Sequence, residues 1–134
     1  MARLILDTNA LIDLERYGQT PTQVSATDDI AIAAITFAEI LHGVRAADPA
    51  HRAARERFAL DVQETIDILP YTTATAAEHA VLLDHVRRTG KPRGAHDLII
   101  AAHARQSGRQ VVSRDARARF GDLPGVNVVV EDRR

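Results

Sequence analysis

The sequence predicts an α/β fold in which a central, mostly parallel sheet of four to five strands is flanked by helices. Short apolar runs alternate with longer stretches whose apolar residues recur at helical spacing. Strands that alternate with helices in this way usually form a parallel sheet, with the helices packed on both of its faces. The apolar runs that we expect to form strands are residues 3–6, 30–35, 66–70, 111–113 and 126–130.

The helical stretches fall between these runs and carry recognisable stop signals. Pro49 is expected to end the second helix, because a proline disfavours helical backbone at the residue before it. Gly108 is expected to end the last helix. The expected helices are residues 9–17, 36–47, 50–64, 75–88 and 96–107. We expect one domain over residues 1–134, with residues 131–134 as a flexible tail.

The composition limits the kinds of site that the chain can carry. There is no cysteine, which excludes a disulfide framework, a thiolate zinc site and a cysteine nucleophile. The net charge is −1, so the chain does not bind nucleic acid through overall positive charge. The N-terminus has no basic leader, and the apolar runs fall short of the ~18 residues that a membrane helix needs. We therefore expect a cytoplasmic protein that makes no membrane contact.

Four acidic residues lie at comparable places, at strand ends or helix starts, and each has a structural explanation. Asp7 could cap the first helix, since aspartate is a favoured N-cap residue. Thr36 and Glu39 have the spacing of a capping box. Asp97 lies in a first helical turn, where the helix dipole favours an anion, and Asp115 could begin a short turn after a strand.

Taken together, the four acids favour a metal site. In a parallel sheet the strand ends and the following helix starts lie at one edge, so all four carboxylates would meet there. Two carboxylates ~4 Å apart repel by ~1 kcal/mol in water and by ~4 kcal/mol at an effective dielectric constant of 20. Such a cluster is stable only when a cation fills it. Oxygen ligands without cysteine indicate Mg²⁺ or Mn²⁺.

Four segments of the chain resemble the signature blocks of PIN-domain ribonucleases, and most closely those of the VapC-type toxins of bacterial toxin–antitoxin systems. Their order and spacing match along nearly the whole chain. The segments are residues 4–9 (LILDTN), 35–43 (ITFAEILHG), 96–104 (HDLIIAAHA) and 111–115 (VVSRD).

The resemblance implies a Mg²⁺- or Mn²⁺-dependent endoribonuclease that hydrolyses RNA phosphodiester bonds. The acids that it places in the catalytic metal pocket are Asp7, Glu39, Asp97 and Asp115. Thr8 and Ser113 would support the pocket with hydroxyl groups, and Asn9 would help to position Asp7 or a water. One feature departs from the family pattern, because Phe120 follows Asp115 by five residues where the family commonly has an aromatic residue after four. The resemblance also implies a cognate antitoxin partner and a homodimer.

Basic residues near the third and fourth blocks are candidate RNA contacts. Arginine can bind phosphate through two parallel hydrogen bonds, although a solvated basic surface would have the same composition. The candidates are Lys91, Arg93, Arg114 and Arg117. If they hold the RNA backbone, reversing the charge of Arg93 and Arg117 weakens binding and flattens its salt dependence.

The histidines offer a second reading of the chemistry. Glu39 and His42 have the Glu-x-x-His spacing of di-iron helical proteins, but that site needs the motif twice, and only one copy is present. His96 stands beside Asp97 at a helix start, where it could approach the pocket or remain an exposed residue near the cap.

Two other functions remain open from the residues alone. An aspartate-nucleophile phosphatase also begins with an apolar strand that ends in aspartate, but it usually has a second acid two residues later, where this chain has Asn9. A non-catalytic regulatory domain could use the acids for a structural ion. Cleavage of RNA that requires Mg²⁺ would separate the ribonuclease from both.

Overall fold

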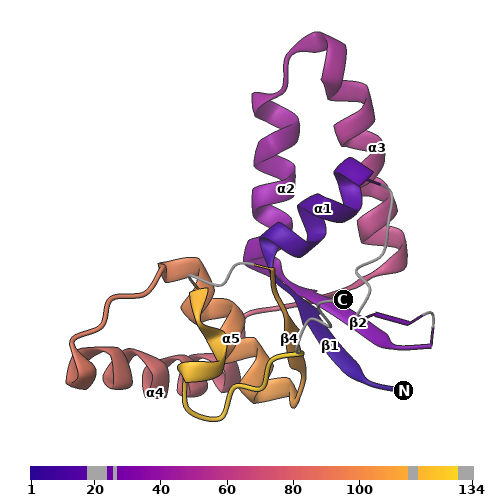
Figure 1. Cartoon of the computed structure of the whole chain (residues 1–134). Coiled ribbons are helices and arrows are strands. Elements are labelled where there is room, and N and C mark those ends of the chain that lie inside the picture. Colours follow the sequence, from indigo (N-terminus) through magenta and orange to yellow (C-terminus); the bar gives the residue numbers. More distant parts are fainter. Residues whose placement is uncertain (18–23, 26, 115–117, 130–134) are drawn as a thin grey trace.

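A four-stranded parallel sheet forms the centre of the computed structural model, which describes residues 1–17, 24–25, 27–114 and 118–129 (Figure 1). Its strands are β1 (Arg3–Leu6), β2 (Asp29–Ala33), β3 (Asp67–Leu69) and β4 (Gln110–Val112). Their order in the sheet is β3-β2-β1-β4. Because β1 pairs with both β2 and β4, its carboxyl end lies between two neighbouring strand ends. The predicted α/β class and parallel sheet are confirmed.

The last predicted strand is reduced to a single bridge. Val128 pairs in parallel with Val111, and Val129 donates a backbone hydrogen bond to the carbonyl of Val111 over 3.0 Å. The remainder of that run, Val130, and the predicted tail at 131–134 lie outside the described residues.

In the described part of the chain, five α-helices surround the sheet, and the glycines that end two of them have left-handed backbone. Gly90 and Gly108 follow α4 and α5 with φ angles of 67° and 68°, a region that glycine enters without steric cost. The predicted stop at Gly108 is confirmed. The helices are α1 (Thr8–Tyr17), α2 (Ala34–Ala46), α3 (Pro49–Thr65), α4 (Thr73–Thr89) and α5 (Ala95–Ser107), and a 3₁₀ turn covers Phe120–Asp122. None of these described helices is long and apolar enough to cross a membrane.

The boundary between β2 and α2 differs from the prediction. The helix begins at Ala34, its N-cap Ala33 makes no side-chain capping hydrogen bond, and the predicted capping box of Thr36 and Glu39 is wrong. A continuous apolar run cannot distinguish the end of a buried strand from the first turn of a buried helix. The correction matters for function, because it removes the structural explanation for Glu39.

Pro49 begins a helix and does not end one. It is the first residue of α3, where its missing N–H group and fixed φ angle fit the helix start. The side chain of Asp48 caps this helix by accepting a hydrogen bond from the N–H group of His51 over 3.1 Å. α2 and α3 therefore form a tight hairpin that projects from the sheet (Figure 1).

The core has two halves, one on each face of the sheet. Side chains alternate along β1, so Ile5 belongs to one hydrophobic cluster while Leu4 and Leu6 belong to the other. The first cluster packs α4 and α5 against the sheet, through residues that include Leu82 and Ile100. The second packs α1 and the α2–α3 hairpin against the opposite face. The prediction of helices on both faces is confirmed.

A buried histidine lies between α4 and α5. His103 is 1% exposed, its ring meets Tyr71 edge-on with the ring centroids 6.1 Å apart, and neither ring nitrogen has a hydrogen-bond partner among the described residues. Burial lowers the pKa of His103 below its usual value, and the nearby His79 lowers it further. Both effects favour the neutral form of His103 in the folded protein.

We expect this histidine to make the protein less stable in acid. Its pKa is depressed on folding, so below the ordinary value of ~6.5 the unfolded chain binds a proton that the folded chain does not. The free energy of unfolding should fall with decreasing pH by up to ~1.4 kcal/mol per unit from this group. Urea titrations across this range should show a shallower dependence for His103→Leu, and an unchanged one for His42→Ala, since His42 is exposed. An equal slope in His103→Leu and the wild type would contradict the assignment.

Candidate active site

Asp7 directly follows β1, and both of its carboxylate oxygens accept hydrogen bonds within the protein. Its Oδ1 accepts the N–H group of Ala10 over 2.9 Å, which caps α1, and its Oδ2 accepts the hydroxyl of Ser113 over 2.5 Å. The residue is 3% exposed. Ser113 reaches it because β4 runs beside β1, and the N–H group of Asp7 bonds to the carbonyl of Val112. The side chain of Asp7 therefore caps α1 and also lies at the carboxyl edge of the sheet.

Glu39 lies on α2, where donors from two other helices meet it. The hydroxyl of Thr8, the first residue of α1, donates to Glu39 Oε1 over 3.2 Å. The Nδ1 atom of His96, at the start of α5, lies 2.7 Å from the same oxygen. The carboxylate of Glu39 thus connects α2 with the beginnings of α1 and α5, which are far apart in the sequence.

Asp97 occupies the first turn of α5, where the helix dipole stabilises its negative charge. The residue before this helix is Gly94, whose carbonyl accepts the N–H group of Leu98 over 3.1 Å. A Cβ atom at Gly94 would lie 3.1 Å from Oδ2 of Asp97, closer than ordinary van der Waals contact. The absence of a side chain there leaves room for the carboxylate of Asp97.

These contacts bring three of the four predicted acids into one region. Thr8 follows Asp7 and His96 precedes Asp97, so the contacts of Glu39 with Thr8 and His96 draw all three acids to the carboxyl edge of the sheet. The fourth acid, Asp115, lies outside the described residues. Among the described residues, no three His, Asp or Glu side chains already form a group that could hold a metal ion. The three acids lie in one region, but the described side chains do not by themselves form a complete set of metal ligands.

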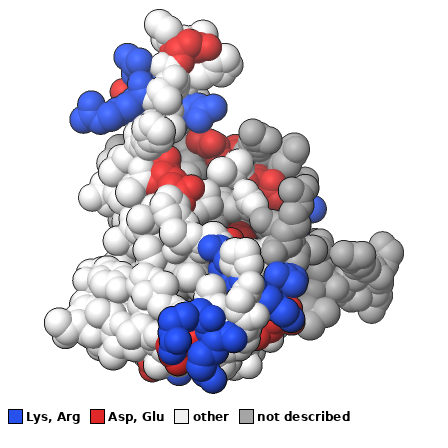
Figure 2. All heavy atoms as spheres, turned by 90° about the vertical axis from the view of Figure 1, so that its left-hand side faces the viewer, with Lys and Arg blue, Asp and Glu red and all other residues white. Residues whose placement is uncertain are grey.

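The donor chemistry of this region suits a hard divalent cation. Carboxylate oxygens from Asp7, Glu39 and Asp97 are accompanied by the hydroxyls of Thr8 and Ser113, and the chain has no thiol. Mg²⁺ and Mn²⁺ take such oxygen ligands. In Figure 2, acidic side chains gather in the middle of the visible face, with basic side chains above and below them.

The predicted RNA contacts differ in their exposure. Lys91 is exposed in the loop before α5. Asn9, which was predicted to support the pocket and not to bind RNA, is exposed in the first turn of α1. Arg114 is exposed and pairs with Oδ2 of Asp13 over 2.9 Å. Arg117 lies outside the described residues.

Arg93 has a structural role that its sequence position did not reveal. Its side chain is 6% exposed, and its guanidinium donates to the carbonyls of Ala118 and Arg119 over 2.5 and 2.7 Å. Arg119 has a φ angle of 45°, a strained conformation for a residue with a side chain. Arg93 therefore links this loop to the start of α5. Its contact with RNA remains a prediction.

A cavity of about 240 Å³ adjoins Glu39 and contains residues that the sequence did not single out. Gly43 and Arg55 both line it, and a Cβ atom at Gly43 would lie 3.3 Å from a guanidinium nitrogen of Arg55. Nothing in the local sequence links these two positions, because only the folding of the α2–α3 hairpin brings them together. The lining residues are Thr8, Ile12, Glu15, Glu39, Ile40, His42, Gly43 and Arg55.

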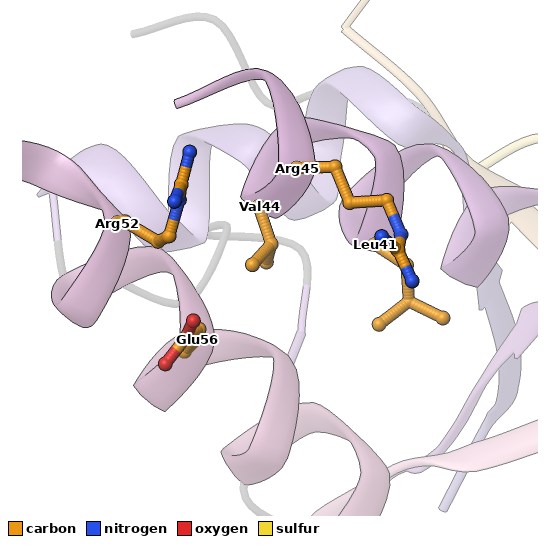
Figure 3. Close-up of a pocket in the computed structure, with 5 residues that line it drawn as sticks. All are labelled: Leu41, Val44, Arg45, Arg52 and Glu56. Atoms are coloured by element: carbon orange, nitrogen blue, oxygen red, sulfur yellow. The ribbon is translucent and has the colours of Figure 1, made fainter. Parts of the chain in front are cut away.

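A larger cleft of about 580 Å³ lies between α2 and α3 but contains none of the predicted site residues. Leu41, Val44 and Arg45 come from α2, and Arg52 and Glu56 come from α3 (Figure 3). Its lining mixes apolar and charged groups, without the carboxylate cluster that metal-dependent chemistry needs. Size alone therefore does not locate the active site.

Comparison with known proteins explains why acids gather at this edge. The family model of the PIN domain matches residues 4–125, which include Asp7, Glu39 and Asp97. The chain belongs to the PIN-domain family. The predicted resemblance is thereby confirmed, and nucleases of this family generally use a divalent metal ion.

The relatives of this PIN domain include curated nucleases. A ribonuclease VapC of Rickettsia bellii is 34% identical over 103 residues, which is 75% of this chain and 76% of the relative. A tRNA(fMet)-specific endonuclease VapC of Shigella flexneri is 28% identical over 124 residues, which is 87% of this chain and 89% of the relative. These two proteins place the chain among the VapC-type PIN domains.

Solved structures agree with that placement. The VapBC-5 toxin–antitoxin complex of Mycobacterium tuberculosis contains a chain with a TM-score of 0.77 and 27% sequence identity, and the match covers 96% of this PIN domain and 98% of that chain. The likeness extends over the whole sheet and its helices, so the similarity is not confined to the acidic motifs.

Proposed function

We propose that this PIN domain is a metal-dependent endoribonuclease that acts as the toxin of a toxin–antitoxin pair. The observation that carries the proposal is the double contact of Glu39 Oε1 with Thr8 and His96, which gathers three acids at the carboxyl edge of the sheet. Curated VapC relatives that are named as nucleases support it.

The proposed metal ligands are Asp7, Glu39, Asp97 and Asp115. Ser113 and Thr8 would hold the carboxylates of Asp7 and Glu39 through the hydrogen bonds described above, and Asn9 would order solvent beside Asp7. When bound, Mg²⁺ or Mn²⁺ supplies an activated water and neutralises charge on the scissile phosphate. The role of the protein is to hold the carboxylates at this edge and to position the RNA strand beside them.

The proposed substrate is RNA, and tRNA is the first class to test because a relative is named for tRNA(fMet). The proposed backbone contacts are Lys91, Arg114 and Arg117, which would complement the phosphates around an acidic centre. We propose that this activity takes place in the cytoplasm.

We expect the exposed basic residues to set the salt dependence of RNA binding. Replacing both Lys91 and Arg114 by alanine removes two phosphate contacts, so the slope of log K against log[salt] should fall by roughly 0.7 per lost contact for a single strand. The exposed Arg87→Ala on α4, whose guanidinium pairs with Asp84, serves as the control. Equal slopes in the double variant and the wild type would exclude these side chains as phosphate contacts.

The proposed partners are an antitoxin and a second copy of the chain. Solved relatives are toxin–antitoxin complexes, and one from Salmonella typhimurium is a DNA-bound VapBC with a TM-score of 0.76 and 26% identity. An antitoxin that carries a basic group into the acidic centre would inhibit by displacing the metal ion. Light scattering of the purified chain, alone and with its antitoxin, measures both associations.

Incubation with a tRNA mixture tests the proposed activity. Cleavage should require Mg²⁺ or Mn²⁺ and stop in EDTA, and the mapped products should carry 5′-phosphate ends. Hydrolysis of small phosphate esters without RNA cleavage would favour a phosphatase. If the chain cleaves neither substrate but still binds the metal, it is a non-catalytic domain.

Added Mg²⁺ should raise the melting temperature. A cation that binds only the folded cluster stabilises it by about 1.4 kcal/mol at ten times the dissociation constant, which corresponds to roughly 5 °C for a chain of this size. Calorimetry with Mg²⁺ and with EDTA measures the shift, and Asp97→Asn should reduce it. A melting temperature that is insensitive to millimolar Mg²⁺ would mean that the folded protein has no preformed pocket.

A further inference from the structure

His96 makes a contact that the proposed metal site does not by itself require. It is the second residue of α5, its side chain is 53% exposed, and its Nδ1 atom lies 2.7 Å from Oε1 of Glu39. The hydroxyl of Thr8 donates to the same oxygen over 3.2 Å. Two donors from different helices therefore converge on one of the two carboxylate oxygens of Glu39.

We propose that His96 is a positioning residue that, together with Thr8, fixes Oε1 of Glu39 and leaves Oε2 to bind the divalent cation. The inference rests on the proposed metal site and adds a residue to it. Because a carboxylate only accepts hydrogen bonds, the contact assigns the proton of the imidazole to Nδ1. A neutral histidine is sufficient for this role, and no proton is transferred.

The physical benefit of these two hydrogen bonds is that they restrict the motion of the Glu39 side chain, which is a flexible metal ligand. A glutamate side chain has several rotatable bonds, and fixing it costs up to about 1.5–2 kcal/mol of rotamer entropy. The side chain of Glu39 is 34% exposed, so packing alone does not lock it. Hydrogen bonds from Thr8 and His96 supply the missing restraint before the metal binds. Residues that orient metal ligands in this way typically contribute 10–100-fold to metal affinity.

Because the donor atom of His96 is Nδ1, variants can be chosen that either keep or remove this hydrogen-bond donor. Nδ1 of histidine is attached to Cγ, and the amide nitrogen of asparagine occupies the same place along the side chain. His96→Asn can therefore keep a neutral N–H donor to Glu39, whereas His96→Ala removes it. Glutamine places its amide one bond further out, where it matches Nε2 and not Nδ1.

The chain also contains a matched control. His42 lies one helical turn after Glu39 on α2 and lines the cavity beside it. It is exposed, and its ring has no hydrogen-bond or ion-pair partner among the described residues. Replacing His42 by alanine removes an imidazole near Glu39 without removing a hydrogen bond to that carboxylate.

Titration of the full chain with Mn²⁺, followed by calorimetry or by the electron paramagnetic resonance of free Mn²⁺, tests the inference. His96→Ala should weaken Mn²⁺ binding by about 10-fold or more, while His96→Asn should restore most of the affinity. His42→Ala should bind as the wild type does. In RNA cleavage at saturating metal, His96→Ala should recover a kcat close to that of the wild type, because the loss lies in metal affinity.

Each other outcome has a definite meaning. Wild-type affinity in His96→Ala would overturn the inference. A low kcat at saturating Mn²⁺ in both His96→Ala and His96→Asn would also overturn it, because the imidazole would then take part in the chemical step. If the wild type itself bound no Mn²⁺, the proposed metal site would be wrong. That conclusion depends on the wild type alone and not on any His96 variant. Melting curves confirm that each variant is folded.

Discussion

Replacing Asp7 by asparagine is expected to abolish RNA cleavage while leaving the fold intact. Loss of an outer partner of a metal ligand costs 10–100-fold, so loss of a ligand itself should reduce kcat/KM by more than about 100-fold. Asparagine is also a good N-cap, so it can still accept the N–H group of Ala10 and preserve the start of α1. The melting temperature in EDTA should change by only a few degrees.

The control for this substitution is an acid of the same type outside the site. Asp84 lies on α4, and its carboxylate pairs with Arg87 and Arg88. Asp84→Asn should cleave RNA at the wild-type rate. Equal cleavage by Asp7→Asn and the wild type would show either that the activity belongs to a contaminant or that the site lies elsewhere.

Replacing Arg109 by alanine is expected to be the most destabilising of these changes, without touching the acidic centre. The side chain is 5% exposed and lies beside the amino ends of the strands, opposite the acids. One guanidinium nitrogen donates to the carbonyls of Leu4 and Asp29 and to Oδ1 of Asp29, over 3.0–3.1 Å. Removing it leaves these acceptors without their donor, which should cost about 3 kcal/mol of unfolding free energy.

Arg3 provides the comparison, because it approaches the same carboxylate from outside. Its Nε atom lies 3.8 Å from Asp29, and its side chain is 53% exposed. Exposed ion pairs of this kind contribute less than about 1 kcal/mol. Chemical denaturation should therefore rank Arg109→Ala well below Arg3→Ala in stability. Similar values for the two variants would mean that burial of Arg109 does not decide its contribution.

The location of Asp7, Glu39 and Asp97 could be predicted from the sequence because local patterns indicate it. An apolar run that ends in Asp7, together with the regular alternation of strands and helices, is enough to place one edge of a parallel sheet. Once the connections are parallel, Glu39 and Asp97 fall at the same edge. The position of each acid relative to its nearest strand end or helix start depends only on residues close to it in the sequence.

The hydroxyls of Thr8 and Ser113 were predicted to support the acids, but the exact partners of His96, Arg109 and Arg93 could not be predicted, because those partners are distant in the sequence. The contact of His96 with Glu39 spans 57 positions, and Arg109 reaches a carbonyl 105 positions away. The sequence placed Arg93 among loop cations, but the fold turns its guanidinium onto the carbonyls of Ala118 and Arg119. The boundary at Ala34 failed for a different reason, because a buried strand end and a buried helical turn have the same apolar composition.

The two hydrogen bonds of Asp7 have a consequence for genetics. One oxygen accepts the N–H group of Ala10 and the other accepts the hydroxyl of Ser113, so a substitution that we expect to silence the toxin can leave the fold intact. Asp and Asn codons differ by one base, which makes this inactivation a single mutational step. A cell that carries such an allele would still produce a folded decoy that sequesters antitoxin. Any intact second copy of the toxin would then be released from control, so the silenced allele would behave as a dominant one.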